Sequence, residues 1–180
     1  MRFLLSLVFA AALVVPETGF SAGDNLPKPP KPTNTTKTCK GNRVWDDNKG
    51  RCVRPKKSSL NDDQLYGAVR ELAYAGRYED AQSVLSAMPD QADDRVLTYW
   101  GFTHRKLGNL ELANVFYERA ISRNPDNLLA RSYMGQGFVA EGRTEDAIAQ
   151  WREIRARGGE GSWPEQSLRE AIRSGFTYGY

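Results

Sequence analysis

The residues of this 180-residue chain best suited to redox, metal or acid–base chemistry are two cysteines and one histidine. Cys39 and Cys52 enclose a segment that is too long for a CxxC redox motif. Within it, Asp47-Asn48-Lys49-Gly50 favours a tight turn between two short strand-like flanks. An isolated hairpin of this size is marginally stable. We therefore expect a Cys39–Cys52 disulfide, which stabilises the loop by about 3 kcal/mol in an oxidising compartment.

The other reactive side chains do not form a pattern typical of an enzyme. His104 has no neighbouring Ser or Cys pattern that would make it a general base, so we expect it to pack in the core. Two thiols without His or acidic partners are a poor metal site. The glycines at positions 158, 159 and 161 do not have the spacing of a phosphate-binding loop. The expectation is a non-enzymatic protein with no catalytic residue, no metal and no cofactor.

The elements that position these residues follow from a regular spacing of glycines. Gly76, Gly108 and Gly142 lie 32 and 34 residues apart, and each is followed five residues later by an alanine. A period near 34 is typical of stacked helix–turn–helix repeats. In the unit 94–127, apolar residues at helical spacing predict two helices on either side of a short turn, and Pro125 ends the second. Helices joined by so short a turn must lie antiparallel.

This unit resembles the tetratricopeptide repeat (TPR). Its matching residues, in the order of the family pattern, are Leu97, Trp100, Gly101, His104, Ala113, Tyr117, Ala120 and Pro125. His104 stands where the family has Tyr. The units 62–93 and 128–161 keep most of the pattern, although the first is two residues short and the third has Gly159 in place of the proline. The resemblance implies an all-α, right-handed superhelical stack of about three TPR units.

The chain after the third unit predicts a terminal helix. Ser162 and Glu165 fit a capping box, and Pro164 fits the first turn of a helix, so we expect a capping helix over 162–174. Such a helix covers the apolar end face that stacked repeats leave. A Gly/aromatic tail follows over 175–180. Trp163, Phe176, Tyr178 and Tyr180 are expected to be exposed, so a monomer and a weak dimer are both open.

The N-terminal third predicts export. Residues 1–22 have the basic start and short apolar run of a signal peptide, which places the protein in the periplasm or outside the cell without a transmembrane span after cleavage. An uncleaved anchor is the alternative. We expect a disordered, Pro/Lys-rich linker over 23–38, the disulfide hairpin over 39–53, and a second linker over 54–61. Residues 23–60 carry ten Lys/Arg against three Asp, whereas 61–180 carry fourteen against eighteen Asp/Glu.

The resemblance also implies where a partner would bind. In TPR arrays the first helix of each pair lines a concave groove, and the family positions carry over to cations and aromatics typical of an interface. The predicted groove residues are Tyr66, Arg70, Tyr74, Arg95, Phe102, Arg105, Lys106 and Gln136. They suit a protein or peptide segment with acidic and apolar side chains. The expected function is therefore a protein–protein interaction scaffold of the cell envelope.

The alternative function is an envelope-tethering module, in which the basic arm and the Cys hairpin bind glycan or another anionic envelope polymer. Trp45 could stack on a sugar ring, or it could simply cover the disulfide. The lysines of the arm have no aromatic residues between them, which does not favour nucleic acid as a partner.

Overall fold

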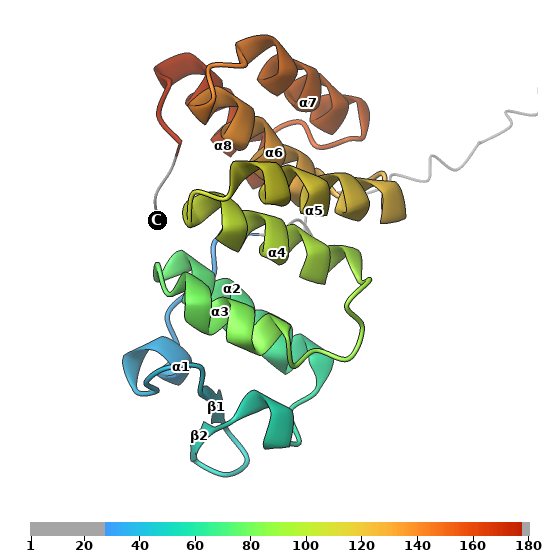
Figure 1. Ribbon diagram of the computed structural model, residues 1–180. Helices are drawn as coiled ribbons and strands as arrows, with labels where there is room; N and C mark the ends of the chain where they lie inside the picture. Colours follow the sequence, from blue (N-terminus) through green and yellow to red (C-terminus); the bar gives the residue numbers. More distant parts are fainter. Residues whose placement is uncertain (1–27, 178–180) are drawn as a thin grey trace, which may run out of the picture.

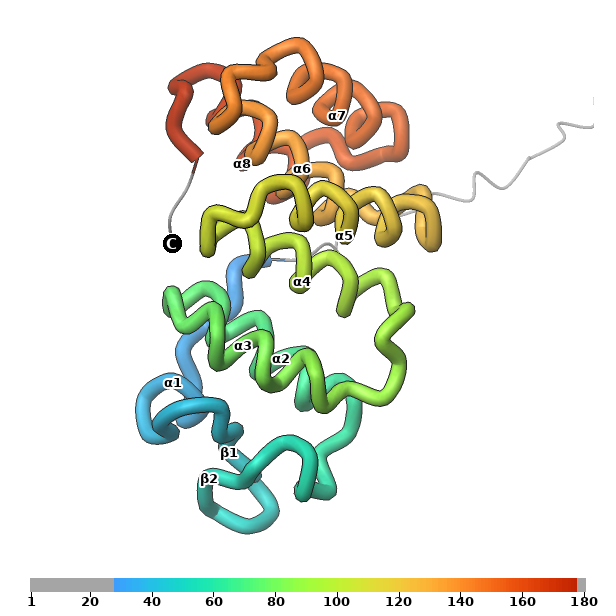
Figure 2. Tube along the Cα trace, viewed as in Figure 1, coloured from blue at the N-terminus to red at the C-terminus, as the bar shows by residue number. Residues whose placement is uncertain are grey.

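The computed structural model describes residues 28–177, and these residues form a mostly helical chain with one small two-stranded hairpin. Three helix pairs follow one another along the molecule, and an eighth helix lies at the end (Figure 1). The pairs are α2 (Asp62–Tyr74) with α3 (Tyr78–Leu85), α4 (Asp94–Lys106) with α5 (Leu110–Arg123), and α6 (Leu128–Ala140) with α7 (Thr144–Ala156). The trace in Figure 2 shows each pair doubling back through a short turn.

The turns and helix ends form where the sequence supplies the right side chains. Gly108 has a φ of 86° in the turn between α4 and α5, a conformation that side chains with a Cβ rarely adopt. Asn61 caps α2 by accepting from the Gln64 backbone N–H at 2.9 Å, and the Gln64 side chain completes the capping box. Ser162 caps α8 (Trp163–Ser174) by accepting from the Glu165 backbone N–H at 3.4 Å, which confirms the predicted helix, but the Glu165 side chain contacts Trp151 and does not complete the predicted capping box.

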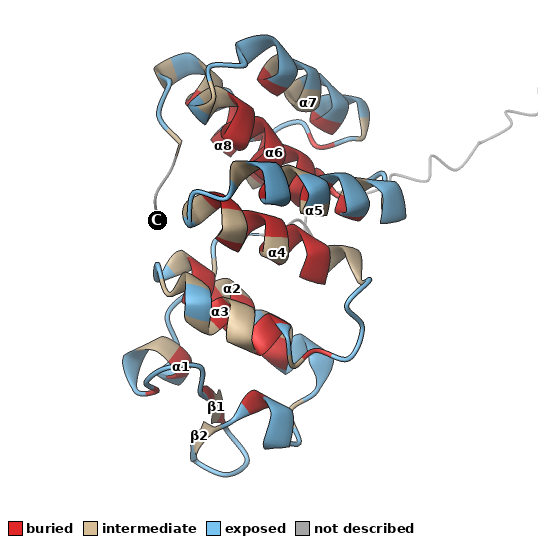
Figure 3. Cartoon of the chain, in the orientation of Figure 1, coloured by how far each residue is buried: buried red, intermediate tan, exposed pale blue. Residues whose placement is uncertain are grey.

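The core runs along the seam between the paired helices (Figure 3). Gly101 on α4 and the Tyr117 ring on α5 meet so closely that a Cβ at position 101 would lie 2.5 Å from the ring. Tyr117 is fully buried, and Trp100 and Trp151 are half-buried against the core. Helix α6 is buried over most of its length because α5, α7 and α8 all pack around it. The predicted helix pairs therefore nest side by side.

Helix α8 covers the end of the stack. Leu168 is fully buried and packs against Gly135 of α6. The buried Glu165 carboxylate accepts a hydrogen bond from the Trp151 indole of α7 at 2.7 Å and contacts Arg169 at 3.4 Å. The aromatic start of this helix differs from expectation: Trp163 is half-buried against the core, not exposed. Phe176, just beyond the helix, is exposed as expected.

The N-terminal region forms a compact unit, hereafter the disulfide module (residues 33–57). It contains α1 (Asn34–Lys37), the antiparallel strands β1 (Val44–Asp46) and β2 (Arg51–Val53), and a 3-10 turn η1 (Pro55–Lys57). Cys39 and Cys52 form the predicted disulfide, with Cα atoms 5.7 Å apart. Val44 is buried in the same core cluster as α2 and α3. The module therefore caps the first helix pair, as Figure 1 shows at the lower end of the stack.

Two predicted linkers need correction. The last part of the segment 23–38, expected to be disordered, contains α1 and is bound to α2 through Glu71. The segment 54–61, also expected to be a linker, contains η1 with Pro55 buried. Composition alone missed α1 because the contacts that order it come from a helix far away in sequence. The predicted signal peptide, residues 23–27 of the linker and residues 178–180 of the tail lie outside the described residues.

Candidate binding cleft

The eight predicted groove residues divide into two groups. Tyr66, Arg70, Tyr74, Arg95 and Lys106 are half-buried on the face that α2 and α4 share. The other three are buried and are therefore corrected: Phe102 is 1% exposed, Arg105 7% and Gln136 0%. A partner cannot reach these three without rearrangement of the fold.

The buried group is covered because aromatic rings fill one half of the predicted groove. Phe102 lies 4.6 Å from the Tyr133 ring and 6.1 Å from the Tyr74 ring, measured between centroids. The hydroxyls of Tyr74 and Tyr133 are 2.8 Å apart, which joins α2 to α6. Trp163 from α8 packs against both tyrosines, at 6.2 and 6.3 Å. Sequence reasoning did not include Tyr133 and Trp163, because family positions do not show that α8 folds back over this face.

Two cations border the aromatic cluster. The Arg105 guanidinium lies over the Phe102 ring at 5.6 Å, and the Lys106 ammonium lies over the same ring at 5.7 Å. Burial, together with the neighbouring Arg105 charge, lowers the pKa of Lys106 to about 8. Lys106 therefore remains mostly charged at pH 7 but loses its charge at a lower pH than an ordinary lysine does.

The other half of the groove remains open as a cleft of about 390 Å³ between α2, α4 and the start of α6. The residues lining this cleft are Tyr66, Arg70, Asp94, Arg95, Thr98, Asn124, Asp126, Asn127, Leu128 and Leu129. Three of the eight predicted groove residues line it: Tyr66, Arg70 and Arg95. The α5–α6 turn supplies much of the rest, and sequence reasoning missed it because it considered only the first helix of each pair.

Tyr66 lies between the two arginines of the cleft. The guanidinium carbons of Arg70 and Arg95 are 5.9 and 5.0 Å from the centroid of its ring. Burial raises the pKa of the Tyr66 hydroxyl well above its ordinary value, so the ring stays neutral. A neutral ring between two cations presents an apolar surface with positive charge at both sides.

The two arginines differ in their partners. Arg95 forms ion pairs with Asp93 at 2.9 Å and Asp63 at 3.1 Å, and the hydrogen bonds that its guanidinium donates to Asp93 raise the pKa of Arg95. Arg70 has no carboxylate partner among the described residues. Its guanidinium donates to the backbone carbonyl of Lys28, and its Nε is buried without a hydrogen-bond partner in the described part of the chain. Arg70 is therefore the cation of the cleft whose hydrogen bonding is least satisfied.

The far wall of the cleft is held in place by a polar network. The Asn127 side chain donates to Asp94 at 2.7 Å and to Thr98 at 2.9 Å, and accepts from the Ala130 backbone N–H at 2.8 Å. Asn124 donates to the same Asp94 carboxylate at 2.9 Å. The network fixes the start of α6 on α4 and satisfies Asp94, so this acidic group does not repel an anionic ligand as strongly as a free carboxylate would.

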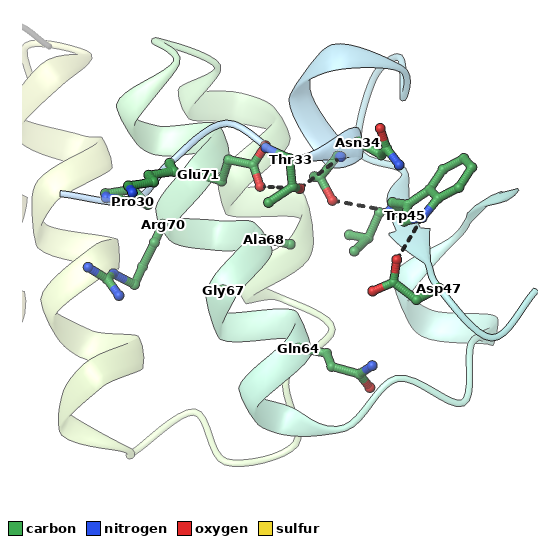
Figure 4. Close-up of a pocket in the computed structure, with 13 residues that line it drawn as sticks. Pro30, Thr33, Asn34, Trp45, Asp47, Gln64, Gly67, Ala68, Arg70 and Glu71 are labelled. Atoms are coloured by element: carbon green, nitrogen blue, oxygen red, sulfur yellow. Dashed lines mark hydrogen bonds between the residues drawn. The ribbon is translucent and has the colours of Figure 1, made fainter. Parts of the chain in front are cut away.

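A second cleft, of about 450 Å³, separates the disulfide module from α2 (Figure 4). The Glu71 carboxylate on its wall accepts four hydrogen bonds, from the backbone N–H and hydroxyl groups of Thr33 and Thr36. Burial disfavours the charged carboxylate, but these hydrogen bonds outweigh it and lower its pKa. Trp45 is half-buried at the other side, and its indole N–H donates to Asp47 at 2.9 Å. The polar edge of Trp45 is thus already occupied.

His104 is half-buried, and its ring is stacked on Phe116 at 5.5 Å and on Trp100 at 5.8 Å. Burial lowers its pKa, which favours the neutral ring. Within residues 28–177, no group of three or more His, Cys, Asp or Glu side chains could hold a metal ion. Nor does any helix in this range have the length and apolar character to cross a bilayer. The disulfide is typical of proteins from an oxidising compartment.

Comparison with known proteins does not assign the chain to a family. No family model matches it, and neither a curated protein nor a solved structure shows significant similarity.

Proposed function

We propose that this protein is a non-enzymatic interaction scaffold of the cell envelope, built on TPR-like helix pairs, that binds a peptide segment in the cleft between α2, α4 and α6. The observation that carries the proposal is Arg70, a half-buried cation that lines the open cleft and has no carboxylate partner among the described residues. A signal peptide over residues 1–22 would deliver the chain to the periplasm or the outside, where the disulfide is stable.

The chemistry of the cleft suggests a partner with one acidic and one apolar side chain close together. The acidic group would take the place of the Lys28 carbonyl at Arg70, because a carboxylate accepts the planar guanidinium in a bidentate geometry. The apolar group would lie on Tyr66, Leu128 and Leu129. Such a partner competes with the chain's own Lys28, whose backbone carbonyl accepts from Arg70.

The test is peptide binding measured by fluorescence anisotropy, with the best ligand from an array of acidic–apolar peptides. Arg70→Glu is expected to weaken binding at least ten-fold, or about 1.4 kcal/mol. Arg119→Glu is the matched control, because Arg119 is exposed on α5 and lies over Phe116, away from the cleft. Arg70→Lys keeps the charge but removes the planar fork, so an intermediate loss is expected. Equal affinities for the Arg70→Glu and Arg119→Glu variants would exclude the cleft as the binding site.

A further inference from the structure

The disulfide module and the residues beside it carry many positive charges, none of which lines the cleft between α2, α4 and α6. Between residues 28 and 60 there are ten Lys/Arg and two Asp. These cations are Lys28, Lys31, Lys37, Lys40, Arg43, Lys49, Arg51, Arg54, Lys56 and Lys57. All ten side chains belong to exposed residues. The charge therefore lies on the solvent side of the module.

Almost none of this charge is neutralised within the described residues. Asp46 is buried and accepts from the backbone N–H groups of Asn48 and Lys49, both at 3.1 Å, and it forms an ion pair with the Lys49 ammonium at 3.4 Å. Asp47 accepts from Trp45. The other nine cations form no ion pair in the described part of the chain.

The way in which the module is attached to the stack turns these cations outward. The contacts with α2 and with the start of α3 use Glu71, which binds Thr33 and Thr36, and Arg77, which donates to the carbonyls of Cys39 and Gly41. No lysine of the module takes part in them. The module lies at one end of the stack (Figure 1), and residues 61–180 have a small excess of acidic groups. The molecule is thus positive at one end and weakly negative along the rest.

We propose that this basic end is a docking surface for a bilayer that contains anionic phospholipid. Eight of the ten cations are spread over α1 and the loop after it, the hairpin turn, and the segment from β2 to η1, whereas Lys28 and Lys31 precede α1, so the cations do not line one groove. Only Lys31 of the ten lines the cleft beside the module. A broad surface of exposed lysines and arginines fits a plane of negative headgroups, whereas a single bound anion needs a cradle.

A membrane fits the module better than single-stranded nucleic acid. Sequence-tolerant binding of single strands uses aromatic side chains on which bases stack. Trp45 is the one aromatic residue of the module, and it is half-buried with its N–H bound to Asp47. The charge asymmetry would also orient the molecule, with α1, the hairpin and η1 toward the lipid and the peptide cleft held away from it.

The experiment measures co-sedimentation with large unilamellar vesicles. The protein used in the experiment begins at Gly23, close to the expected signal-peptide cleavage site. The apolar residues 3–15 are thus absent and cannot contribute to lipid binding. Vesicles of phosphatidylcholine with roughly 30–40% phosphatidylglycerol, which have a strong negative surface potential, are compared with vesicles of phosphatidylcholine alone. The variant Arg51→Gln/Arg54→Gln/Lys57→Gln is compared with Arg119→Gln/Arg123→Gln/Arg152→Gln, which removes the same charge from exposed residues of α5 and α7.

The expected result is binding to the anionic vesicles, loss of binding in high salt and no binding to the neutral vesicles. The module variant is expected to bind about 100-fold more weakly, at about 1 kcal/mol per charge, and the stack variant to bind almost like the unchanged protein. Equal losses in the two variants would mean that net charge acts and the basic end does not. Capture of polyphosphate or duplex DNA in place of the vesicles would overturn the membrane assignment. Peptide affinity at the cleft is measured on the same variants and should not change.

Discussion

Glu71 is the residue on which attachment of the disulfide module depends most directly. Its carboxylate is 6% exposed and accepts from two backbone N–H groups and two hydroxyls at the N-terminal end of α1, at 2.5 to 3.0 Å. A carboxylate at a helix N-terminus also interacts favourably with the helix dipole. The Glu71 side chain of α2 thus accepts from backbone N–H groups at the start of α1 that have no partner within that helix.

Replacing Glu71 by Gln is expected to lower the free energy of unfolding by about 2 kcal/mol at pH 7, because four donors lose a charged acceptor. The pKa of Glu71 is lowered in the folded state from its ordinary 4.5, so its contribution is complete above that value and is lost as the pH falls through the folded pKa. Urea denaturation at pH 7 and pH 3 should therefore show a difference between the two proteins that shrinks in acid. Glu79→Gln, at an exposed position of α3, is the control. A pH-independent difference would contradict this account.

Close packing between helices depends on a few glycines at which two helices approach each other. Gly101 lets α4 approach the Tyr117 ring of α5, and Gly135 lets α6 approach Leu168 of α8. The first contact is with a rigid, fully buried ring, whereas the second is with the flexible end of a leucine side chain. The α4–α5 pair is therefore the less tolerant of added volume.

Gly101→Ala is expected to destabilise the protein by about 2 kcal/mol, because the added methyl group overlaps the Tyr117 ring and the helices must separate. Gly67→Ala is the matched control: Gly67 is also inside a helix, α2, but a Cβ there meets nothing within 4 Å. Alanine in place of Gly67 should stabilise the protein by about 0.5–1 kcal/mol, since it restricts the unfolded chain and favours the helix. Urea denaturation should give opposite signs. Two changes of the same sign would show that packing at Gly101 is not the deciding term.

The molecule as a whole is a linear series in which each helix pair packs mainly on its neighbours, closed by the disulfide module at one end and by α8 at the other. In such a series, damage at one end should spread only to the adjoining pair. Both ends are stabilised by buried apolar side chains and by hydrogen bonds, and the first has a covalent cross-link in addition.

The variant Cys39→Ser/Cys52→Ser tests this arrangement. Losing the cross-link is expected to cost about 3 kcal/mol at the disulfide module, because the loop it closes becomes free in the unfolded chain. Amide hydrogen exchange should then rise in residues 33–57 and in α2 and α3, whereas α6, α7 and α8 should stay protected. The unchanged protein in the same buffer is the reference. Uniformly faster exchange along the chain would instead show that the stack unfolds as a single unit.

Local signals in the sequence were enough to locate the helix pairs, the capping helix, the hairpin and the disulfide. They depend on neighbours along the chain: the glycine–alanine spacing, the capping residue Ser162, and the turn between the two cysteines. The tertiary contacts decided which predicted groove residues remain accessible. Phe102 is buried against Tyr133 of α6, Arg105 lies beside Gly137 of α6, and Gln136 donates to Ser167 of α8 at 3.1 Å.

The same distinction applies to the segment before the hairpin. Its proline and lysine content predicted a solvated linker, yet Glu71, some 35 residues further on, orders α1 against α2. The sequence of residues 33–38 lacks the apolar side chains that would bury a core by themselves, so no local pattern could have revealed this. Propensity, spacing and capping act within a few residues, whereas burial and buried hydrogen bonds depend on which distant elements meet.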